Sequence, residues 1–158
     1  MRELPDEIVN CERIRSLIAR SGRLLDRGGF DEYVNLYAVD GTYSLEAKSD
    51  EIGRDTIWQQ LDRAELATLF KEAPQHVRDK AHRTHLVTTD EIEVSGSAAK
   101  AISTFAVFRT TLYGETNVYA LGSYEDNLII DAATDWKLKN RRVRVDTRSL
   151  TTPTPIPL

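Results

Sequence analysis

From His82 to Thr110 the chain reads HRTHLVTTDEIEVSGSAAKAISTFAVFRT, and apolar and polar residues alternate along much of this stretch. A period of two predicts strands, and the Ser-Gly-Ser at 95–97 predicts the turn between them. Further segments of the same kind follow, separated by turn signals at 113–115 and 131–133. The predicted strands are 83–94, 99–110, 117–130 and 135–147. Their short connections favour sequential antiparallel pairing.

The last of these strands contains a slip in its alternation. Trp136 and Leu138 share one face, whereas Val143 and Val145 have the opposite parity. A β-bulge near Asn140–Arg142 returns both pairs to the core side and also curves the sheet.

Before His82 the pattern is mainly helical. Apolar and small residues recur at steps of three and four, which predicts a first helix that starts near Pro5 and ends at Gly28-Gly29. A second, short helix is predicted over 30–38. The stripe of the first helix comprises Ile8, Cys11, Ile14, Leu17, Ile18, Ser21, Leu24 and Leu25.

The region between this helical pair and His82 contains one more strand and one more helix. Asp40-Gly41 is a turn signal, and residues 42–45 are typical of a strand. After a polar loop at 46–54, Asp55 is the predicted N-cap of a third helix, which ends at Pro74. The apolar positions of this helix are Ile57, Leu61, Leu66 and Leu69.

The order α-α-β-α-β-β-β-β predicts an α+β fold, with helices on one face of a curved antiparallel sheet. A cavity between these layers is the natural place for a small ligand. We expect a single domain over residues 1–147. The proline-rich segment 148–158 is expected to be an extended surface or intersubunit arm.

Composition excludes several classes of protein. The 158 residues are 41% hydrophobic and 29% charged, which suits one globular domain with its own core. The net charge of −4 argues against nucleic-acid binding. No apolar run approaches the ~20 residues that span a bilayer, and the charged N-terminus lacks a signal-peptide stretch. A single cysteine, Cys11, favours a reducing cytoplasm.

The chain resembles the SnoaL-like branch of the nuclear transport factor 2-like, or cystatin-like, superfamily. The resemblance covers about residues 12 to 147. Its motifs are LLDRGGFD at 24–31, LYAVDGTY at 36–43, GRDTI at 53–57, RTHLVT at 83–88, GSYED at 122–126 and WKL at 136–138. Their order and spacing specify the fold more than the reaction.

The small, or beta, subunits of aromatic-ring-hydroxylating dioxygenases share this fold. The stretches 83–87, 122–128 and 142–146 and the Pro-Leu tail are similar to theirs. The GRDTI motif favours the SnoaL-like enzymes, and the chain is short for a dioxygenase subunit. It also lacks the aromatic-proline segment that usually follows the first strand of those subunits. Both interpretations therefore stay open.

The resemblance to dehydratases of this superfamily implies an Asp26–His85 catalytic dyad. A carboxylate bonded to one imidazole nitrogen fixes the tautomer, so the other nitrogen can exchange a proton. Tyr43 matches a pocket-lining aromatic position and is expected to hydrogen-bond a substrate oxygen. The alternative for each is structural: a helix-end carboxylate, a core histidine and a packing tyrosine.

Trp58, Phe105, Leu121 and Tyr124 are expected to shape the substrate pocket, although core packing explains each of them singly. No metal site is predicted, since His82 and His85 face opposite sides of a regular strand. The basic run at 137–144 is interpreted as a solvated strand or a subunit contact.

The first functional hypothesis is a dehydratase or isomerase. It would transfer protons without a cofactor on a small cyclic or polyketide-like, apolar or aromatic molecule. The alternatives are a non-catalytic dioxygenase beta subunit, whose partner is a large iron-bearing chain, and a ligand-binding module. A homodimer or homotrimer is expected from the superfamily.

Overall fold

A computed structural model describes residues 6–75, 79–133, 135–151 and 156–158 of the chain. The predicted helix start at Pro5 lies outside these residues. The elements are α1 (Asp6–Arg27), α2 (Phe30–Val34), β1 (Tyr37–Ala47), η1 (Asp50–Ile52), β2 (Thr56–Asp62), α3 (Arg63–Glu72), η2 (Ala73–Gln75), β3 (His82–Ser95), β4 (Ala98–Thr110), β5 (Thr116–Ile130) and β6 (Trp136–Val145).

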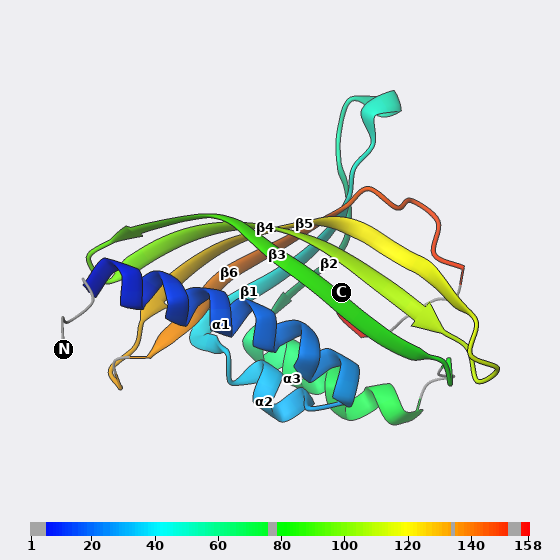
Figure 1. The fold of residues 1–158 in the computed structure, drawn as a ribbon, viewed down its shortest axis with the longest axis horizontal. Coiled ribbons are helices and arrows are strands. Elements are labelled where there is room, and N and C mark those ends of the chain that lie inside the picture. Colours follow the sequence, from blue (N-terminus) through cyan, green and yellow to red (C-terminus); the bar gives the residue numbers. More distant parts are fainter. Residues whose placement is uncertain (1–5, 76–78, 134, 152–155) are drawn as a thin grey trace.

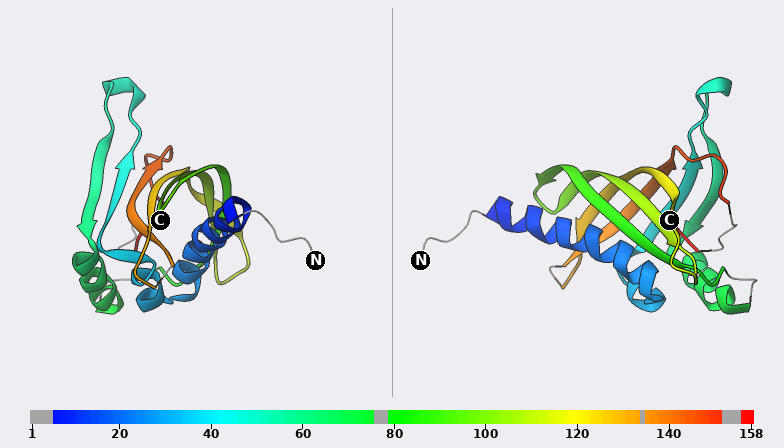
Figure 2. Two further views of the ribbon diagram at one scale, coloured as in Figure 1. Left: turned by 90° about the vertical axis from the view of Figure 1, so that its left-hand side faces the viewer. Right: turned by 45° about the vertical axis from the view of Figure 1, so that its right-hand side comes forward.

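The strands form one sheet in the order β2-β1-β6-β5-β4-β3. Among the strand pairings of the described residues, that of β1 with β6 alone is parallel; the other four are antiparallel, as predicted for β3 to β6. The sheet curves strongly, α1 runs along its inner face, and α2 and α3 lie at one end (Figures 1 and 2). This arrangement is the predicted α+β fold.

The predicted bulge in β6 is confirmed, one residue before the expected range. Asn127 of β5 pairs with Asn140, whereas Leu128 pairs with Leu138, so Lys139 is the extra residue. The extra residue shifts the parity of burial along the strand. As a result, side chains on both sides of the bulge face the core: Trp136, Leu138, Arg141, Val143 and Val145.

The second helix is shorter than predicted, and Asp40-Gly41 is not a turn between elements. The helix ends at Val34, and the strand β1 already begins at Tyr37. The Asp-Gly pair lies inside β1, at an irregularity in its pairing with β6. Glycine is required there, because a Cβ on Gly41 would lie 2.9 Å from two backbone carbonyl oxygens.

The prediction that Asp55 caps the third helix is wrong. Residues 56–62 form β2, which pairs with β1 in a hairpin that projects from the body of the molecule (Figure 1). The helix starts only at Arg63, where Asp62 accepts from the backbone N–H of Glu65 and Glu65 accepts from that of Asp62. This reciprocal capping box fixes the helix start seven residues later than expected.

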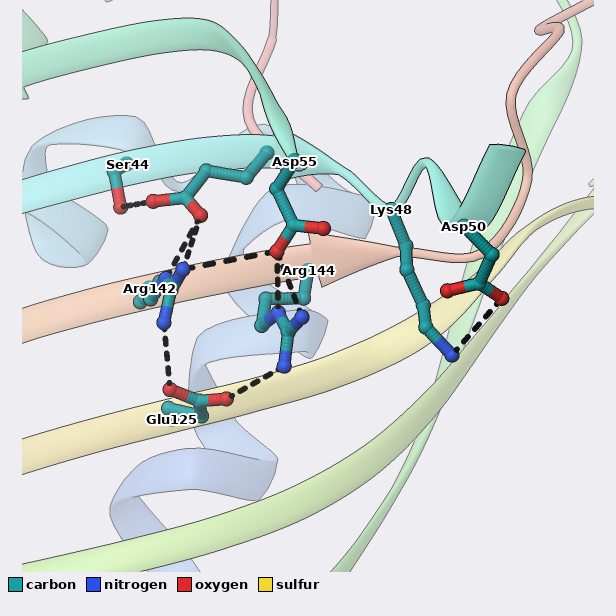
Figure 3. Close-up of polar contacts among 8 residues, drawn as sticks. Ser44, Lys48, Asp50, Asp55, Glu125, Arg142 and Arg144 are labelled. Carbon is teal, nitrogen blue, oxygen red and sulfur yellow. Dashed lines mark hydrogen bonds and ion pairs between the residues drawn. The ribbon is translucent and has the colours of Figure 1, made fainter. Parts of the chain in front are cut away.

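The outer face of the sheet carries a ladder of ion pairs near this hairpin. Arg142 and Arg144 both contact Glu125 on β5, while Arg142 also binds Glu46 and Arg144 binds Asp55 (Figure 3). These five side chains, called the outer ladder below, connect β1, β5, β6 and the start of β2.

The segment that was expected to be an extended surface or intersubunit arm enters the protein at its far end. Leu158 is fully buried and belongs to the main apolar core, against which Ile156 also packs. Residues 152–155 of that arm lie outside the described part of the chain. Among the described residues, no helix combines the length and apolar character that crossing a bilayer requires.

Candidate functional site

Asp26, near the end of α1, and His85, near the start of β3, meet as predicted. The imidazole Nδ1 lies 2.5 Å from Asp26 Oδ1, and the backbone N–H of His85 donates to Asp26 Oδ2 at 2.9 Å. One carboxylate therefore holds both the ring and the main chain of the same residue. The His85 side chain is only 2% exposed.

Close packing between α1 and β3 makes this contact possible. A Cβ on Gly22 would lie 2.8 Å from Cβ of His85, so only glycine lets the helix approach the strand so closely. Gly22 and Asp26 are four residues apart, which places both on the face of α1 that is turned toward β3.

Because an ionised carboxylate can only accept hydrogen bonds, the geometry places the imidazole proton on Nδ1. In the neutral ring, Nε2 is then an acceptor. It is buried and has no hydrogen-bond partner among the described residues. A general base would use this nitrogen to reach a substrate, but the groove described below does not include His85.

A buried ion pair next to this dyad was not predicted. Arg141 on β6 donates to both carboxylate oxygens of Asp126 on β5, at 2.8 and 2.7 Å, and to Ser21 Oγ on α1 at 2.8 Å. Neither charged side chain is exposed. The basic run at 137–144 therefore turns one arginine inward. The bulge in β6 is the sequence signal that reveals it, because the shift in parity places residue 141 on the core side.

Tyr124 on β5 lies within the same interior. The Tyr124 ring stacks on the ring of Phe105, with 4.5 Å between their centroids. The guanidinium of Arg141 lies over the Tyr124 ring, 4.3 Å from its centroid. Burial raises the pKa of the Tyr124 hydroxyl, so this group stays protonated. Its oxygen is buried and, like His85 Nε2, lacks a partner among the described residues.

Tyr43 is buried in the core, but its hydroxyl is already engaged. It accepts a hydrogen bond from the backbone N–H of Leu158 at 3.2 Å. Burial also raises the pKa of Tyr43 well above its usual range. The nearby pair Tyr33 and Tyr37 is satisfied internally, with 3.1 Å between the hydroxyl oxygens.

The other predicted pocket residues separate into two groups. Phe105 and Tyr124 are buried on the inner face of the sheet. Leu121 is 41% exposed on the opposite face, and Trp58 is 37% exposed on the projecting β1–β2 hairpin. Leu121 and Trp58 therefore do not line an interior space with His85, because strand parity and the hairpin direct them outward.

A groove with a volume of about 920 Å³ lies elsewhere on the molecule. It runs along the flank of α1 beside β6, over Leu17, Leu36 and Trp136, and does not include Asp26 or His85. In the described ranges, no three His, Cys, Asp or Glu side chains gather closely enough to hold a metal ion.

Comparison with known proteins connects this architecture to a family. The sequence profile of the SnoaL-like domain matches residues 6–142. The beta subunit of 2-aminobenzenesulfonate 2,3-dioxygenase from Alcaligenes sp. is 28% identical over 87% of this chain and 91% of its own length. The beta subunit of the methanesulfonate monooxygenase hydroxylase from Methylosulfonomonas methylovora is 29% identical over 84% of this chain and 82% of its own.

Solved structures give the same fold. The beta subunit of a proposed aromatic-ring-hydroxylating dioxygenase from Novosphingobium aromaticivorans superposes with a TM-score of 0.81, at 22% identity over 94% of this chain and 96% of that one. The fold is the cystatin-like fold of nuclear transport factor 2-like proteins.

Proposed function

Because the chain belongs to the SnoaL-like domain family, we propose that it is the small, beta-type subunit of an oxygenase and assembles with a larger, iron-bearing chain. The observation that carries this proposal is the pair of curated relatives. Both are beta subunits of oxygenases, and each aligns over more than four-fifths of both chains. The chemistry of oxygen activation would then belong to the partner.

The geometry of Asp26 and His85 supports a structural role in such a subunit. The carboxylate satisfies a backbone N–H at the start of β3 and orients a buried ring, so it fastens α1 to the sheet. Loss of such a buried, charge-assisted contact reduces stability whether or not the residues react with a substrate.

Co-expression with a large, iron-bearing oxygenase chain from the same organism tests the proposal. We expect the two chains to co-purify at a fixed ratio in size-exclusion chromatography with light scattering. A folded His85→Asn variant should still assemble and support oxygenase turnover, although loss of the imidazole–carboxylate contact lowers its stability. A chain that stays apart from every such partner contradicts the proposal.

A second function is favoured by one observation, the unpartnered Nε2 of His85. In this function the chain is an enzyme that transfers protons without a cofactor, a dehydratase or isomerase for a small cyclic compound. His85 would be the general base and acid, Asp26 would orient it, and Tyr43 would assist at the substrate oxygen. A homodimer or homotrimer that needs no partner chain fits this function.

Two substitutions separate the functions once a substrate is found. Under the enzymatic function, His85→Ala and Asp26→Asn should lower turnover by about 10²–10⁴-fold while the circular dichroism spectrum is retained. Unchanged turnover in folded His85→Ala would exclude catalysis by the dyad and leave the subunit function.

A further inference from the structure

We infer that copies of this chain associate head to tail, with the turn between β4 and β5 of one copy inserted into the groove beside α1 of the next. The inference goes beyond the subunit function, because it concerns contacts between copies of this chain and needs no larger chain. It rests on the apolar surface, shape and charge of two regions that lie far apart in the molecule.

The β4–β5 turn, residues 111–115, presents large apolar side chains to solvent at the tip of a long hairpin (Figure 1). Leu112 is 68% exposed and Tyr113 is 94% exposed, and Val118, three residues beyond the turn, is 55% exposed. Single exposed apolar residues are ordinary, whereas several of them together at one tip indicate a contact surface. Tyrosine is also among the residues that contribute most to binding between proteins.

Hydrogen bonds hold this turn in one conformation. Thr111 Oγ1 accepts from the backbone N–H of Tyr113 at 3.3 Å and from that of Glu115 at 3.2 Å. The backbone N–H of Thr111 donates to the carbonyl of Glu115 at 2.8 Å, and that of Gly114 donates to the carbonyl of Thr111 at 3.0 Å. A tip that is already ordered loses little conformational entropy on binding, so its apolar surface is available for association.

The groove beside α1 is the concave counterpart of this tip. Its volume is about 920 Å³, and its apolar lining residues are Ile8, Val9, Leu17, Leu36 and Trp136. The indole N–H of Trp136 donates to Asn10 at 3.1 Å, which fixes the largest of these side chains. Ser16 is small and exposed, so the helix leaves room beside it. The groove thus offers apolar surface that matches the apolar tip.

Charge favours the same pairing. Glu115 in the turn and Arg13 in the groove are exposed, and neither forms an ion pair with another described residue. The groove residues whose charges are paired within the chain are Glu12, Arg20 and Lys137. Arg13 and Asp135 therefore remain for a partner: Arg13 attracts Glu115, and Asp135 is an acceptor for the Tyr113 hydroxyl.

The turn cannot reach the groove of its own chain, because it lies at the end of the molecule opposite to the start of α1 (Figure 1). The contact is therefore heterologous, and each pair of copies keeps one free turn and one free groove. A second copy supplies both the apolar tip and the opposite charge that the groove accommodates. Because a single turn covers little area, the association is weak and depends on concentration.

Two variants that each remove one side of the contact test the inference. The turn variant combines Leu112→Ala with Tyr113→Ala, and the groove variant is Ser16→Trp, which fills the groove from an exposed position. A mixture of the two keeps one intact turn and one intact groove, so fluorescence anisotropy with one labelled chain should show saturable binding. Each variant mixed with itself should bind at least about tenfold more weakly. Association through any other surface contributes equally to all three mixtures.

Two further sets of variants sharpen the test. Arg13→Glu or Glu115→Arg alone should weaken self-association by roughly twofold to fivefold, and the chain with both changes should recover it, because the ion pair is restored with its charges exchanged. Ile57→Ala, at an exposed apolar residue of the other hairpin, is the matched control and should leave self-association unchanged.

Three results would overturn the inference: equal binding in the mixed and the like pairs, no binding at concentrations up to about 1 mM, or a double charge variant as weak as the single ones. If the turn variant loses only its co-purification with a large oxygenase chain, the turn serves that chain and the inference is wrong. Association between copies is measured without the large chain, so its failure is distinct from failure of the subunit function.

Discussion

The carboxylate of Asp26 uses both of its oxygens on a single residue, His85, and this contact is compatible with either proposed function. It joins the end of α1 to the start of β3, two segments 59 positions apart in sequence. The family motifs were sufficient to predict this pair. They carried no information on Arg141, because an arginine within a basic, alternating run is indistinguishable from its solvated neighbours until the bulge at Lys139 is placed.

The buried pair of Arg141 and Asp126 yields a prediction about stability. Arg141→Met leaves Asp126 as an uncompensated buried charge and should lower the free energy of unfolding by about 3–5 kcal/mol. Asp126→Leu combined with Arg141→Met removes both charges and should recover much of that loss. Urea unfolding of the single and double variants measures the difference. A double variant as unstable as the sum of the singles would show that the pair is not coupled.

Among the elements, β2 shows how local sequence misleads. Thr56-Ile57-Trp58 contains β-branched and aromatic residues that suit a strand, yet Ile57, Leu61, Leu66 and Leu69 also have helical spacing. Pairing with β1 selects the strand for residues 56–62. The capping box from Asp62 then starts the helix. Short segments of this kind are decided by tertiary pairing, whereas the long alternation from His82 onward was sufficient to predict β3 to β6.

The cap at Asp62 yields a second prediction. Asp62→Ala removes the acceptor for the Glu65 backbone N–H and should lower the free energy of unfolding by about 0.5–2 kcal/mol. Glu72→Ala, at the other end of α3, is the matched control. It removes an acidic side chain from the end of the helix where the dipole disfavours it, and should not be destabilising. Thermal unfolding followed by circular dichroism compares the two, and equal losses would contradict the role of the cap.

Across the whole molecule, the outer ladder joins strands that are distant in sequence, and its acidic groups make the fold sensitive to low pH. The hydrogen bond from Arg144 holds the pKa of Asp55 below its ordinary value. A depressed folded-state pKa means that the unfolded chain binds the proton first as pH falls. The contribution of Asp55 to stability is therefore complete above its unfolded pKa of about 3.9 and is lost as pH falls through the folded value.

Replacement of the arginine tests this linkage. In Arg144→Met the pKa of Asp55 should rise toward its ordinary value, as followed by NMR titration of the carboxyl carbon. The difference in stability between this variant and the wild type should shrink as pH falls below about 4, because protonated Asp55 no longer attracts Arg144. Both side chains are partly exposed, so the difference should also shrink at high salt. An unchanged Asp55 titration would contradict the contact.

The burial of Leu158 shows how the chain uses a proline-rich segment that sequence alone placed on the surface. Prolines exclude the segment from a central strand, but they do not prevent its last residues from entering the core, where Leu158 joins Tyr43. Leu158→Ala should lower the free energy of unfolding by about 2–5 kcal/mol, as expected for a fully buried leucine. Leu112→Ala, at a leucine that is 68% exposed, should change it by less than about 0.5 kcal/mol. If urea unfolding gives both variants wild-type stability, residues 156–158 do not pack in the core in solution, and the hydroxyl of Tyr43 is available to a ligand after all.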